Sequence, residues 1–341
     1  MNPFDLEHWL AARPPALAEV IRQLAAACAE ISRAAARSGL DHAAGDGVVQ
    51  GLAQRAEQCV AHALGDCKQV AGFVTDDQRE PVISPEHGSG GAYLVLANPL
   101  EGEGAGALAG DGPLGTLFSV LPHLFRGTPA SPAAFMQPGR RQVAAGYAIY
   151  GPRTVLVLST REGVQMFTLE PGSDRWLLTQ DAVTVPATGT AVAVDPANQR
   201  FWEKPVQRYV AECVAGQSGP RGRDFTMRWS ESLVADVHGI FARGGVLLDP
   251  RDNREPYRPG RLRLMFEAAP LALLMEQAGG AAANGSAALL DLVPDALQQR
   301  VCVILGSREE VERIVCYHAD PSQNVSWQLF KTRSLFIQPQ A

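Results

Sequence analysis

Acidic residues stand at the ends of three predicted strands, where they could act together on a metal ion. They are Asp76 and Asp77 after GFVT, Glu101 and Glu103 after AYLVLANPL, and Glu267 at the end of RLRLMF. Carboxylate oxygens suit Mg²⁺ or Mn²⁺, and such an ion can orient a phosphoryl group and an attacking water. Each acid alone is more often a solvated loop residue, so the prediction of a phosphatase site depends on their joint placement.

Two other catalytic patterns are weaker. The glycines after AYLVLA resemble a dinucleotide fingerprint, because Gly104, Gly106 and Ala109 have the right spacing. However, no helical pattern follows before Pro113, and no acid lies about 20 residues further on in the right context, so we do not expect a nicotinamide site. A GxSxG segment is absent, which disfavours a serine hydrolase of that type.

The composition is that of a folded chain. It has 341 residues, of which 46% are hydrophobic and 19% charged, and these values exclude disorder, collagen and coiled coil. A net charge of −6 gives no footprint for binding nucleic acid or an anionic membrane. The six cysteines form no CxxC pair and have no zinc spacing. With neither a signal peptide pattern nor about 20 consecutive apolar residues, we expect a cytoplasmic protein with reduced thiols.

Periodicity predicts helices first and strands later in the N-terminal half. Apolar residues recur at helical spacing from Pro14 to about Cys67, which predicts two helices. The segments Val70–Val74 and Ala92–Ala97 are short, apolar and bounded by turn residues, as buried strands are. From Ala144 onward, YAIYG, TVLVLST, VQMFTL and WLLT alternate with turns, which predicts an antiparallel meander.

A turn-rich segment, Asp181–Gly189, is a plausible boundary between two halves. After it we expect helices over PVQRYVAECVAG and SESLVADVHGIFARGG, strands over GVLLDP and RLRLMFE, and a helix over APLALLMEQAGG. A last strand, VCVILGS, precedes a last helix, EEVERIVCY. Strands and helices mix without a strict βαβ rhythm, so a layered α+β fold is favoured over a doubly wound sheet.

Long segments of the chain resemble class 1 fructose-1,6-bisphosphatase in its bacterial form. They are RRQVAAGYAIYGPRTVLVLST, GPRGRDFTMRW, RPGRLRLMFEAAPLALLMEQAGGAA and DLVPDALQQRVCVILGSREEVERI, and with flanking matches the resemblance runs from about Ala43 to Ile314. It implies a layered α/β/α/β/α fold, with residues 1–184 as a metal-binding half and 185–341 as a sugar-phosphate-binding half. It also implies hydrolysis of the 1-phosphate of fructose 1,6-bisphosphate with Mg²⁺, or Mn²⁺ in its place.

The resemblance implies a metal site that this sequence has altered. The family motif DPLDGSS reads NPLEGEG here, so a neutral amide replaces one aspartate and a longer side chain replaces the other. Both changes weaken the hold on a small hard cation, because Mg²⁺ tolerates little deviation from octahedral geometry. The implied catalytic acids are Asp76 and Asp77, and the implied metal ligands are Asp77, Asn98, Leu100, Glu101 and Glu267.

The phosphate-binding residues implied by the resemblance have changed as well. Where the family has two serines, this chain has Glu103 and Gly104 after Gly102. A carboxylate about 4 Å from a phosphate costs of the order of 4 kcal/mol per unit charge at an effective dielectric of 20, and each lost donor costs about 1 to 3 kcal/mol. The other implied substrate-binding residues are Asp195, where asparagine is usual, Arg228, which in the family reaches a neighbouring subunit's pocket, Trp229, and Arg261, which replaces a lysine.

Two further departures fall on chemical positions. Ala53 stands where the family has an aspartate implicated in organising the attacking water, and Asp249 stands where a tyrosine is expected. The framework segments remain intact. This contrast favours the hypothesis of a pseudoenzyme, a folded subunit with lost or strongly reduced activity that associates with itself or with an active paralogue.

The alternative hypothesis is an active metal-dependent sugar-phosphate phosphatase that uses the altered carboxylate cluster. In both cases the resemblance implies a homotetramer, with a homodimer as the second choice, because in the family the arginine that matches Arg228 reaches into the pocket of a neighbouring subunit. The expected small-molecule partner is a sugar phosphate resembling fructose 1,6-bisphosphate, held weakly if the site is impaired.

Overall fold

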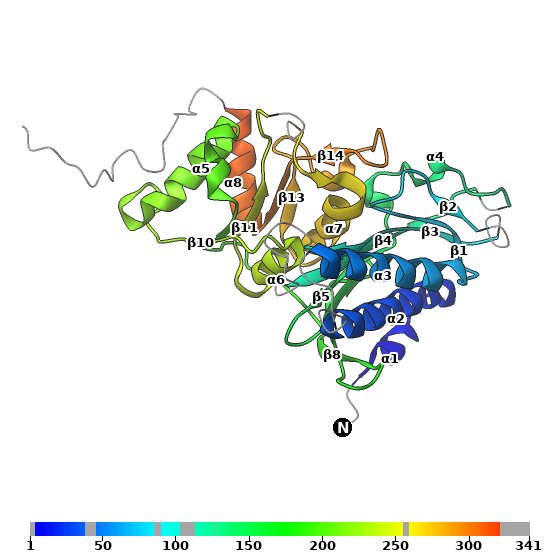
Figure 1. Cartoon of the computed structure of the whole chain (residues 1–341). Helices are drawn as coiled ribbons and strands as arrows, with labels where there is room; N and C mark the ends of the chain where they lie inside the picture. Colours follow the sequence, from blue (N-terminus) through cyan, green and yellow to red (C-terminus); the bar gives the residue numbers. More distant parts are fainter. Residues whose placement is uncertain are drawn as a thin grey trace, which may run out of the picture.

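Two β-sheets alternate with three layers of helices through the molecule (Figure 1). The structure is a computed structural model that describes residues 4–37, 46–84, 90–102, 113–125, 127–254 and 259–320, with 46–50 described for the backbone alone. The layers are, in order, α2 (Pro15–Arg37) and α3 (Asp46–Gly65), an eight-stranded sheet, α6 (Leu233–Arg243) and α7 (Ala269–Gln277), a five-stranded sheet, and α5 (Lys204–Ala215) and α8 (Arg308–Ala319). The layered α/β/α/β/α prediction is confirmed.

The first sheet is largely an antiparallel meander. Its strands, in spatial order, are β2 (Val82–Ile83), β1 (Val70–Thr75), β3 (Tyr93–Glu101), β4 (Leu114–Pro122), β5 (Ala144–Tyr150), β6 (Val155–Ser159), β7 (Gln165–Leu169) and β8 (Trp176–Gln180). Only β1 and β3 pair in parallel. The predicted strands and meander are confirmed, whereas β4 had no prediction: nearly all of it is buried, so it lacks the alternation that marks a half-exposed strand.

The second sheet is smaller and comes from the C-terminal half of the chain. Its strands, in spatial order, are β10 (Thr226–Arg228), β9 (Ala191–Ala193), β11 (Val246–Asp249), β15 (Val303–Gly306) and β13 (Ala281–Ala283). A two-stranded ladder joins β12 (Leu262–Arg263) to β14 (Arg300–Val301), and the short helices are α1 (Leu6–Leu10) and α4 (Pro132–Phe135). Within the described residues, no helix combines the length and apolar character needed to cross a bilayer.

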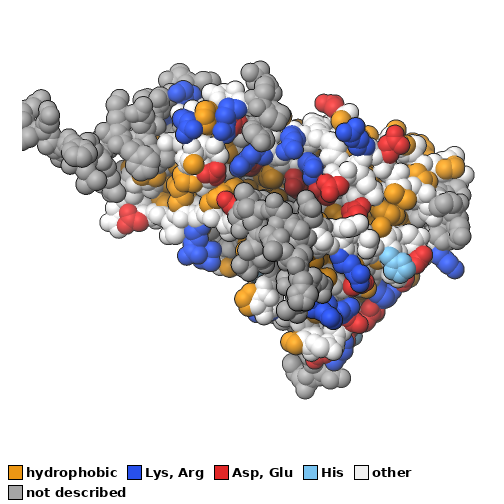
Figure 2. Space-filling view, in the orientation of Figure 1, with side chains coloured by type: hydrophobic (Ala, Val, Ile, Leu, Met, Phe, Trp, Pro, Cys, Tyr) orange, Lys and Arg blue, Asp and Glu red, His pale blue; other side chains and the backbone are white. Residues whose placement is uncertain are grey.

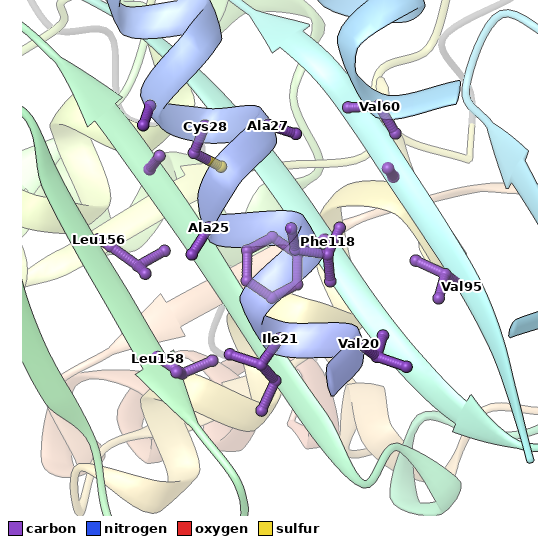
Figure 3. Close-up of a cluster of buried hydrophobic side chains, with 14 of the residues drawn as sticks. Val20, Ile21, Ala25, Ala27, Cys28, Val60, Val95, Phe118, Leu156 and Leu158 are labelled. Carbon is purple, nitrogen blue, oxygen red and sulfur yellow. The ribbon is translucent and has the colours of Figure 1, made fainter. Parts of the chain in front are cut away.

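The outer face of the first sheet is covered by α2. Figure 3 shows Ile21 and Cys28 on α2 among Phe118 of β4 and Leu156 and Leu158 of β6, and all five side chains are at most 1% exposed. The apolar stripe predicted on this segment is the face that packs on the sheet. All six cysteines are free, as expected; Cys316 is exposed and the others are buried.

Strand β11 shows why the second sheet lies inside the molecule. Leu247 packs in the cluster with α6 and α7, whereas Val246 and Leu248 pack in the cluster with α5 and α8. Because side chains alternate along a strand, Leu247 points to one face of the sheet, and Val246 and Leu248 point to the other. Helices cover both faces, so both can be apolar. This places α6 and α7 between the two sheets, where they connect the halves of the chain.

The prediction of a strand over RLRLMFE is wrong beyond Arg263. The chain enters a π-helical turn over Leu264–Ala268 and continues directly into α7. A short apolar run does not distinguish a buried strand from a buried helical turn, and Leu264, Met265 and Phe266 are all buried. The consequence for the site is that Glu267 projects from a helical turn at the N-terminal end of α7.

Helix α6 lies very close to β4 at one glycine. A Cβ atom built on Gly115 would lie 2.4 Å from Cγ2 of Val234 and 2.7 Å from the carbonyl oxygen of Ala148. No side chain fits there, so glycine permits the approach that brings the start of α6 to the end of β3.

We predict that His238 makes the fold sensitive to acid. Its Nδ1 lies 3.0 Å from the hydroxyl of Tyr147, which is fully buried, and burial together with the charge of Arg153 lowers the pKa of His238 below 6.5. The folded state therefore binds this proton less readily than the unfolded state, and the stability present above pH 6.5 falls as the pH drops. The free energy of unfolding by urea, measured between pH 5 and pH 8, should fall more steeply toward acid pH in the wild type than in His238→Gln.

The comparison concerns the slope of the unfolding free energy against pH, so a uniform destabilisation of the variant does not affect it. Equal slopes for the two proteins would show that His238 is not the source of the acid sensitivity.

Candidate active site

A bulge in β3 sets the direction of the side chains that follow it. Asn98 pairs with Leu117 and Glu101 with Gly115, so β3 advances three residues while β4 advances two. Pro99, within the bulge, has no N–H to contribute to the ladder, and its carbonyl oxygen accepts a hydrogen bond from Oγ1 of Thr116 at 2.7 Å. The extra residue brings the side chains of Asn98 and Glu101 to the same face of the sheet, toward α6 and α7.

The carboxylate of Glu101 binds the N-terminus of α6. Its Oε1 accepts from the N–H of Leu233 at 2.6 Å, and its Oε2 accepts from the N–H of Val234 at 3.2 Å and from the hydroxyl of Ser232 at 3.2 Å. Ser232 in turn accepts from the N–H of Ala235. The first N–H groups of a helix lack partners within it, and Glu101 and Ser232 supply them here. The residue implied as a metal ligand therefore acts as a helix cap.

The surroundings of Glu101 disfavour its charge in spite of these bonds. The side chain is 8% exposed, and burial raises its pKa to about 7, while the N–H groups of Leu233 and Val234 oppose this shift and the charge of Glu267 adds to it. Burial penalises a carboxylate because water no longer solvates it. Moving this group from the α6 N-terminus would remove the N–H donors that oppose the rise of its pKa.

Glu267 is the second buried acid of the site. Its Oε2 accepts from the N–H of Arg263 at 2.6 Å, and its Oε1 lies 3.4 Å from Nδ2 of Asn98. Burial raises the pKa of Glu267, and the Arg263 N–H opposes the rise. Oδ1 of Asn98 is buried without a hydrogen-bond partner. The amide of Asn98, where the family motif has an aspartate, thus points its NH₂ group toward the carboxylate of Glu267.

Arg263 supplies positive charge at this site. Its guanidinium forms an ion pair with Asp76, whose backbone N–H joins the turn after β1 to Ala97 of β3. The same residue therefore holds Asp76 through its side chain and Glu267 through its backbone. Arg263 therefore contacts both acids, and its guanidinium supplies the positive charge that pairs with Asp76.

Asp77 is exposed, and Glu57 lies behind it. Glu57, on α3, accepts from Oγ1 of Thr75 at 2.7 Å and from Nε2 of Gln78 at 3.0 Å. Burial raises the pKa of Glu57, these bonds oppose the rise, and the charge of Asp77 adds to it. Glu57 lies one helical turn after Ala53 on α3, so this helix still carries a carboxylate near the position where the family has an aspartate. Its bonds to Thr75 and Gln78 fix the turn that carries Asp76 and Asp77.

The described side chains do not fit a metal centre of the implied kind. Within the part of the chain that the structure describes, no three His, Cys, Asp or Glu side chains gather closely enough to hold a metal ion. Leu100, implied to contribute its carbonyl, is buried with its side chain in the core beneath α2 and α3. Gly102 has φ +94°, and a Cβ there would lie 3.0 Å from the carbonyl oxygen of Pro113. Glu103 and Gly104 lie outside the described residues.

A cavity of about 190 Å³ is lined by two of the expected sugar-phosphate residues, Trp229 and Arg261. Four acids and one arginine line it, so its walls carry far more potential negative than positive charge. Its lining residues are Glu101, Trp229, Glu231, Leu233, Asp236, Leu247, Asp249, Arg261 and Leu262. The predictions for Trp229 and Arg261 thus converge on a common cavity with Glu101.

The arginine of this cavity already has an acidic partner. Nε of Arg261 donates to Asp249 at 2.7 Å, and the Arg261 N–H donates to the same carboxylate at 2.8 Å. Asp249 is 3% exposed, and the guanidinium lies 5.5 Å from the ring centroid of Trp229. Asp249 stands where the resemblance expects a tyrosine. The guanidinium of Arg261, which the resemblance implies as a phosphate contact, is therefore paired with a carboxylate of the chain itself.

Two expected substrate residues lie apart from this cavity. Asp195 caps a 3₁₀ turn: it accepts from the N–H of Ala197 at 3.1 Å and from the amide of Asn198, and it lines neither of the cavities described here. Arg228 is exposed on β10 and lines a second, larger cavity beside α6. Figure 2 shows acidic and basic side chains side by side across the middle of one face, without a single dominant sign there.

Sequence reasoning missed Arg263, Glu57 and Ser232. Arg263 lies in a segment that was correctly predicted as a strand at this point, but nothing in the sequence signals its ion pair with Asp76, which is 187 residues away along the chain. Ser232 is a serine before an amphipathic helix, a pattern that indicates an N-cap. Glu57 had no signal, since its role depends on where α3 meets β1.

Solved structures with a similar fold define the class. The chain is similar to fructose-1,6-bisphosphatase of Leishmania major in its holo form, with a TM-score of 0.84 and 26% identity over 94% of this chain and 100% of that one. The apo form gives a TM-score of 0.83 and 25% identity over the same shares. The layered α+β architecture is therefore that of the fructose-bisphosphatase class of proteins.

Sequence comparisons identify the family. Models described as the fructose-1-6-bisphosphatase N-terminal and C-terminal domains match residues 9–181 and 185–319. The chain is 65% identical over 353 residues to "Fructose-1,6-bisphosphatase class 1 1" of Methylibium petroleiphilum, covering 100% of both chains, and 43% identical over 327 residues to the class 1 protein of Hydrogenophilus thermoluteolus, covering 93% of this chain and 90% of the relative. The chain belongs to the class 1 fructose-1,6-bisphosphatase family.

We predict that removing the Glu101 carboxylate destabilises the fold. In Glu101→Ala the N–H groups of Leu233 and Val234 lose their acceptors while remaining buried, which costs about 1 to 3 kcal/mol of unfolding free energy. Chemical denaturation of the purified protein measures this loss. Glu80→Ala is the matched control, because Glu80 is exposed.

A change below about 0.5 kcal/mol in Glu101→Ala, equal to that of the control, would show that the cap contributes little to folding.

Proposed function

We propose that this chain is a fructose-1,6-bisphosphatase-family subunit whose phosphatase activity is lost or strongly reduced. The observation that carries the proposal is that three of the acids implied at the catalytic and metal-binding positions are engaged by the chain itself. Glu101 binds the α6 N-terminus, Asp76 pairs with Arg263, and Glu267 accepts from the Arg263 N–H. Asn98 adds an amide in place of an anion.

Competition with these internal contacts supports reduced activity. A divalent ion that recruited Glu101 would leave the buried N–H groups of Leu233 and Val234 without acceptors. Taking Asp76 would leave Arg263 without its counter-ion in a half-buried position. Each displaced contact subtracts from the free energy of metal binding, so even a site with the right acids would have low occupancy.

The charge of the sugar cavity supports weak substrate binding in the same way. Arg261 is already paired with Asp249, and Glu231 and Asp236 also line the walls. A bisphosphate would bring further negative charge to this cavity, where like charges repel. Phosphate recognition would have to come from cations outside it, of which Arg228 is the nearest candidate from the sequence.

A second candidate function is an active metal-dependent phosphatase for fructose 1,6-bisphosphate or a similar sugar phosphate. Its support is the relative of 65% identity, which matches over its whole length and is called a fructose-1,6-bisphosphatase. In this case Mg²⁺ or Mn²⁺ would be held by Asp76, Asp77, Glu101 and Glu267, with Glu103 as a further acid. In both cases we propose a cytoplasmic homotetramer, with residues 1–184 as the metal half and 185–341 as the sugar-phosphate half.

The pseudoenzyme proposal also covers partners. A subunit that keeps its framework but has lost turnover would act through association, either with itself or with an active paralogue. Size-exclusion chromatography with light scattering, with and without an active family member, tests this part independently of activity.

Phosphate release from fructose 1,6-bisphosphate separates the two functions. We predict no turnover, or turnover at least about a hundredfold below that of an active class 1 enzyme assayed beside it, with Mg²⁺ and with Mn²⁺ over a wide concentration range, which is a barrier difference of about 2.7 kcal/mol. Turnover within about tenfold of the active enzyme would overturn the pseudoenzyme proposal.

Restoring the family residues should raise activity if the rest of the site is sound. The variant combines Ala53→Asp, Asn98→Asp, Glu101→Asp, Glu103→Ser and Gly104→Ser. We expect measurable phosphate release, because the restored acids and donors meet the needs of the cation and the transferring phosphate. Thermal melting establishes that the variant is folded.

The matched control adds Glu267→Ala to the same variant. The gain should vanish in the control, since Glu267 is the retained acid nearest Asn98. A folded restored variant without any gain would show that residues beyond these five positions have also drifted.

A further inference from the structure

A small cavity with three polar side chains in its lining lies between the first sheet and the start of α7. Its volume is about 10 Å³, which is of the order of the space that one water molecule needs. The lining includes Ser119 of β4, Gln137, Gln142, and Leu264, Met265 and Ala269 around the π-helical turn. The residues implied for metal or substrate binding are not part of this lining, so the inference below does not rest on the proposed function.

Ser119 is a polar residue on an apolar strand face. Side chains at alternate positions of β4 point to the same face, so Ser119 shares its face with Leu117 and Leu121. Leu117 packs in the cluster with residues of α6 and α7, and Leu121 packs in the cluster that contains Met265. Ser119 is 2% exposed. A buried hydroxyl between leucines needs a hydrogen-bond partner at this point.

Gln142 has a satisfied amide NH₂ group and an unsatisfied amide oxygen. Its Nε2 donates to the carbonyl oxygens of Gly139 at 2.9 Å and of Ala269 at 3.0 Å, which uses both hydrogens. Its Oε1 is buried and has no hydrogen-bond partner among the residues that the structure describes. Reversing the amide would place Oε1 against two carbonyl oxygens, so the chain itself fixes this orientation. Gln142 thus holds the first residue of α7 and brings an acceptor to the cavity.

Gln137 repeats this arrangement on the other side of the same segment. Its Nε2 donates to the carbonyl oxygens of Pro122 at 3.0 Å and of Ala134 at 2.8 Å. Its Oε1 is also buried, and no described residue donates to it. Two buried acceptors therefore border one small cavity. A buried acceptor has lost its hydration, and in native proteins such groups are usually satisfied by the chain or by an internal water.

The three polar groups match the hydrogen-bonding capacity of one water molecule. Water has two hydrogens, one for each glutamine Oε1, and its oxygen can accept from the hydroxyl of Ser119. This gives the about three hydrogen bonds that buried water typically makes. Ca²⁺ and Mg²⁺ take about six or more oxygen ligands, whereas the side chains of this lining offer three neutral oxygens and no carboxylate.

We propose that this cavity holds one internal water molecule, which donates to Oε1 of Gln137 and of Gln142 and accepts from the hydroxyl of Ser119. The water connects β4 and the segment 137–142 to the start of α7, directly after the π-helical turn that carries Glu267. It is a structural ligand, because it allows three polar side chains to lie inside a core built of leucine and methionine.

A high-resolution crystal structure of the full chain tests the proposal. We expect one density peak at hydrogen-bond distance, about 2.7 to 3.2 Å, from both Oε1 atoms and from Oγ of Ser119. Crystals soaked in rubidium chloride should show no anomalous peak at this position, since a water and not a monovalent cation occupies it. A cavity without density would overturn the proposal, and so would a rubidium peak.

Relaxation dispersion of ¹⁷O in solution counts internal water molecules with long residence times. Ser119→Val should lower this count by one, because the added methyl groups occupy the cavity and the hydroxyl is lost. Ser131→Val is the matched control: Ser131 is exposed, makes no side-chain capping bond and does not line the cavity, so the count should not change. Thermal melting establishes that both variants are folded.

Equal counts in the wild type and in folded Ser119→Val would overturn the proposal. If Ser119→Val does not fold, the crystal structure of the wild type decides the question alone.

Discussion

The contact between the Glu101 carboxylate and the N-terminus of α6 is the interaction on which the site depends. Helix α6 lies between the two sheets, and its close approach to β4 at Gly115 brings its first N–H groups to the end of β3. A carboxylate at that point satisfies groups that the helix cannot satisfy itself, and the helix dipole favours its charge. The same carboxylate is a residue that the family resemblance implies as a metal ligand, so a metal ion bound there would compete with the helix for it.

The other acids of the site follow the same logic. Asp76 is paired with Arg263 and Asp249 with Arg261, while Glu57 holds the turn after β1 that carries Asp76. A buried charge is strongly destabilising when it loses its partner, whereas a paired one contributes little net stability. Each pairing therefore keeps these acids in their present contacts.

Much of the fold could be predicted from the sequence, because α2 and β5 to β8 have clear periodicities, and the family resemblance supplied the layers. Strand β4 and the π-helical turn at Leu264–Ala268 could not, since nearly all of each segment is buried and the burial has no period that separates a strand from a helical turn. The sequence did place acids at strand ends. It could not show that a bulge at Pro99 turns Glu101 toward α6, because the direction depends on the register with β4.

The most direct measurement is a crystal structure of the protein grown with Mn²⁺ and fructose 1,6-bisphosphate, with anomalous scattering used to locate manganese. The account predicts Glu101 bonded to the N–H groups of Leu233 and Val234, Arg263 against Asp76, and no manganese peak between Asp76 and Glu267. A strong manganese peak there, with Glu101 rotated away from α6 to ligate it, would contradict the account.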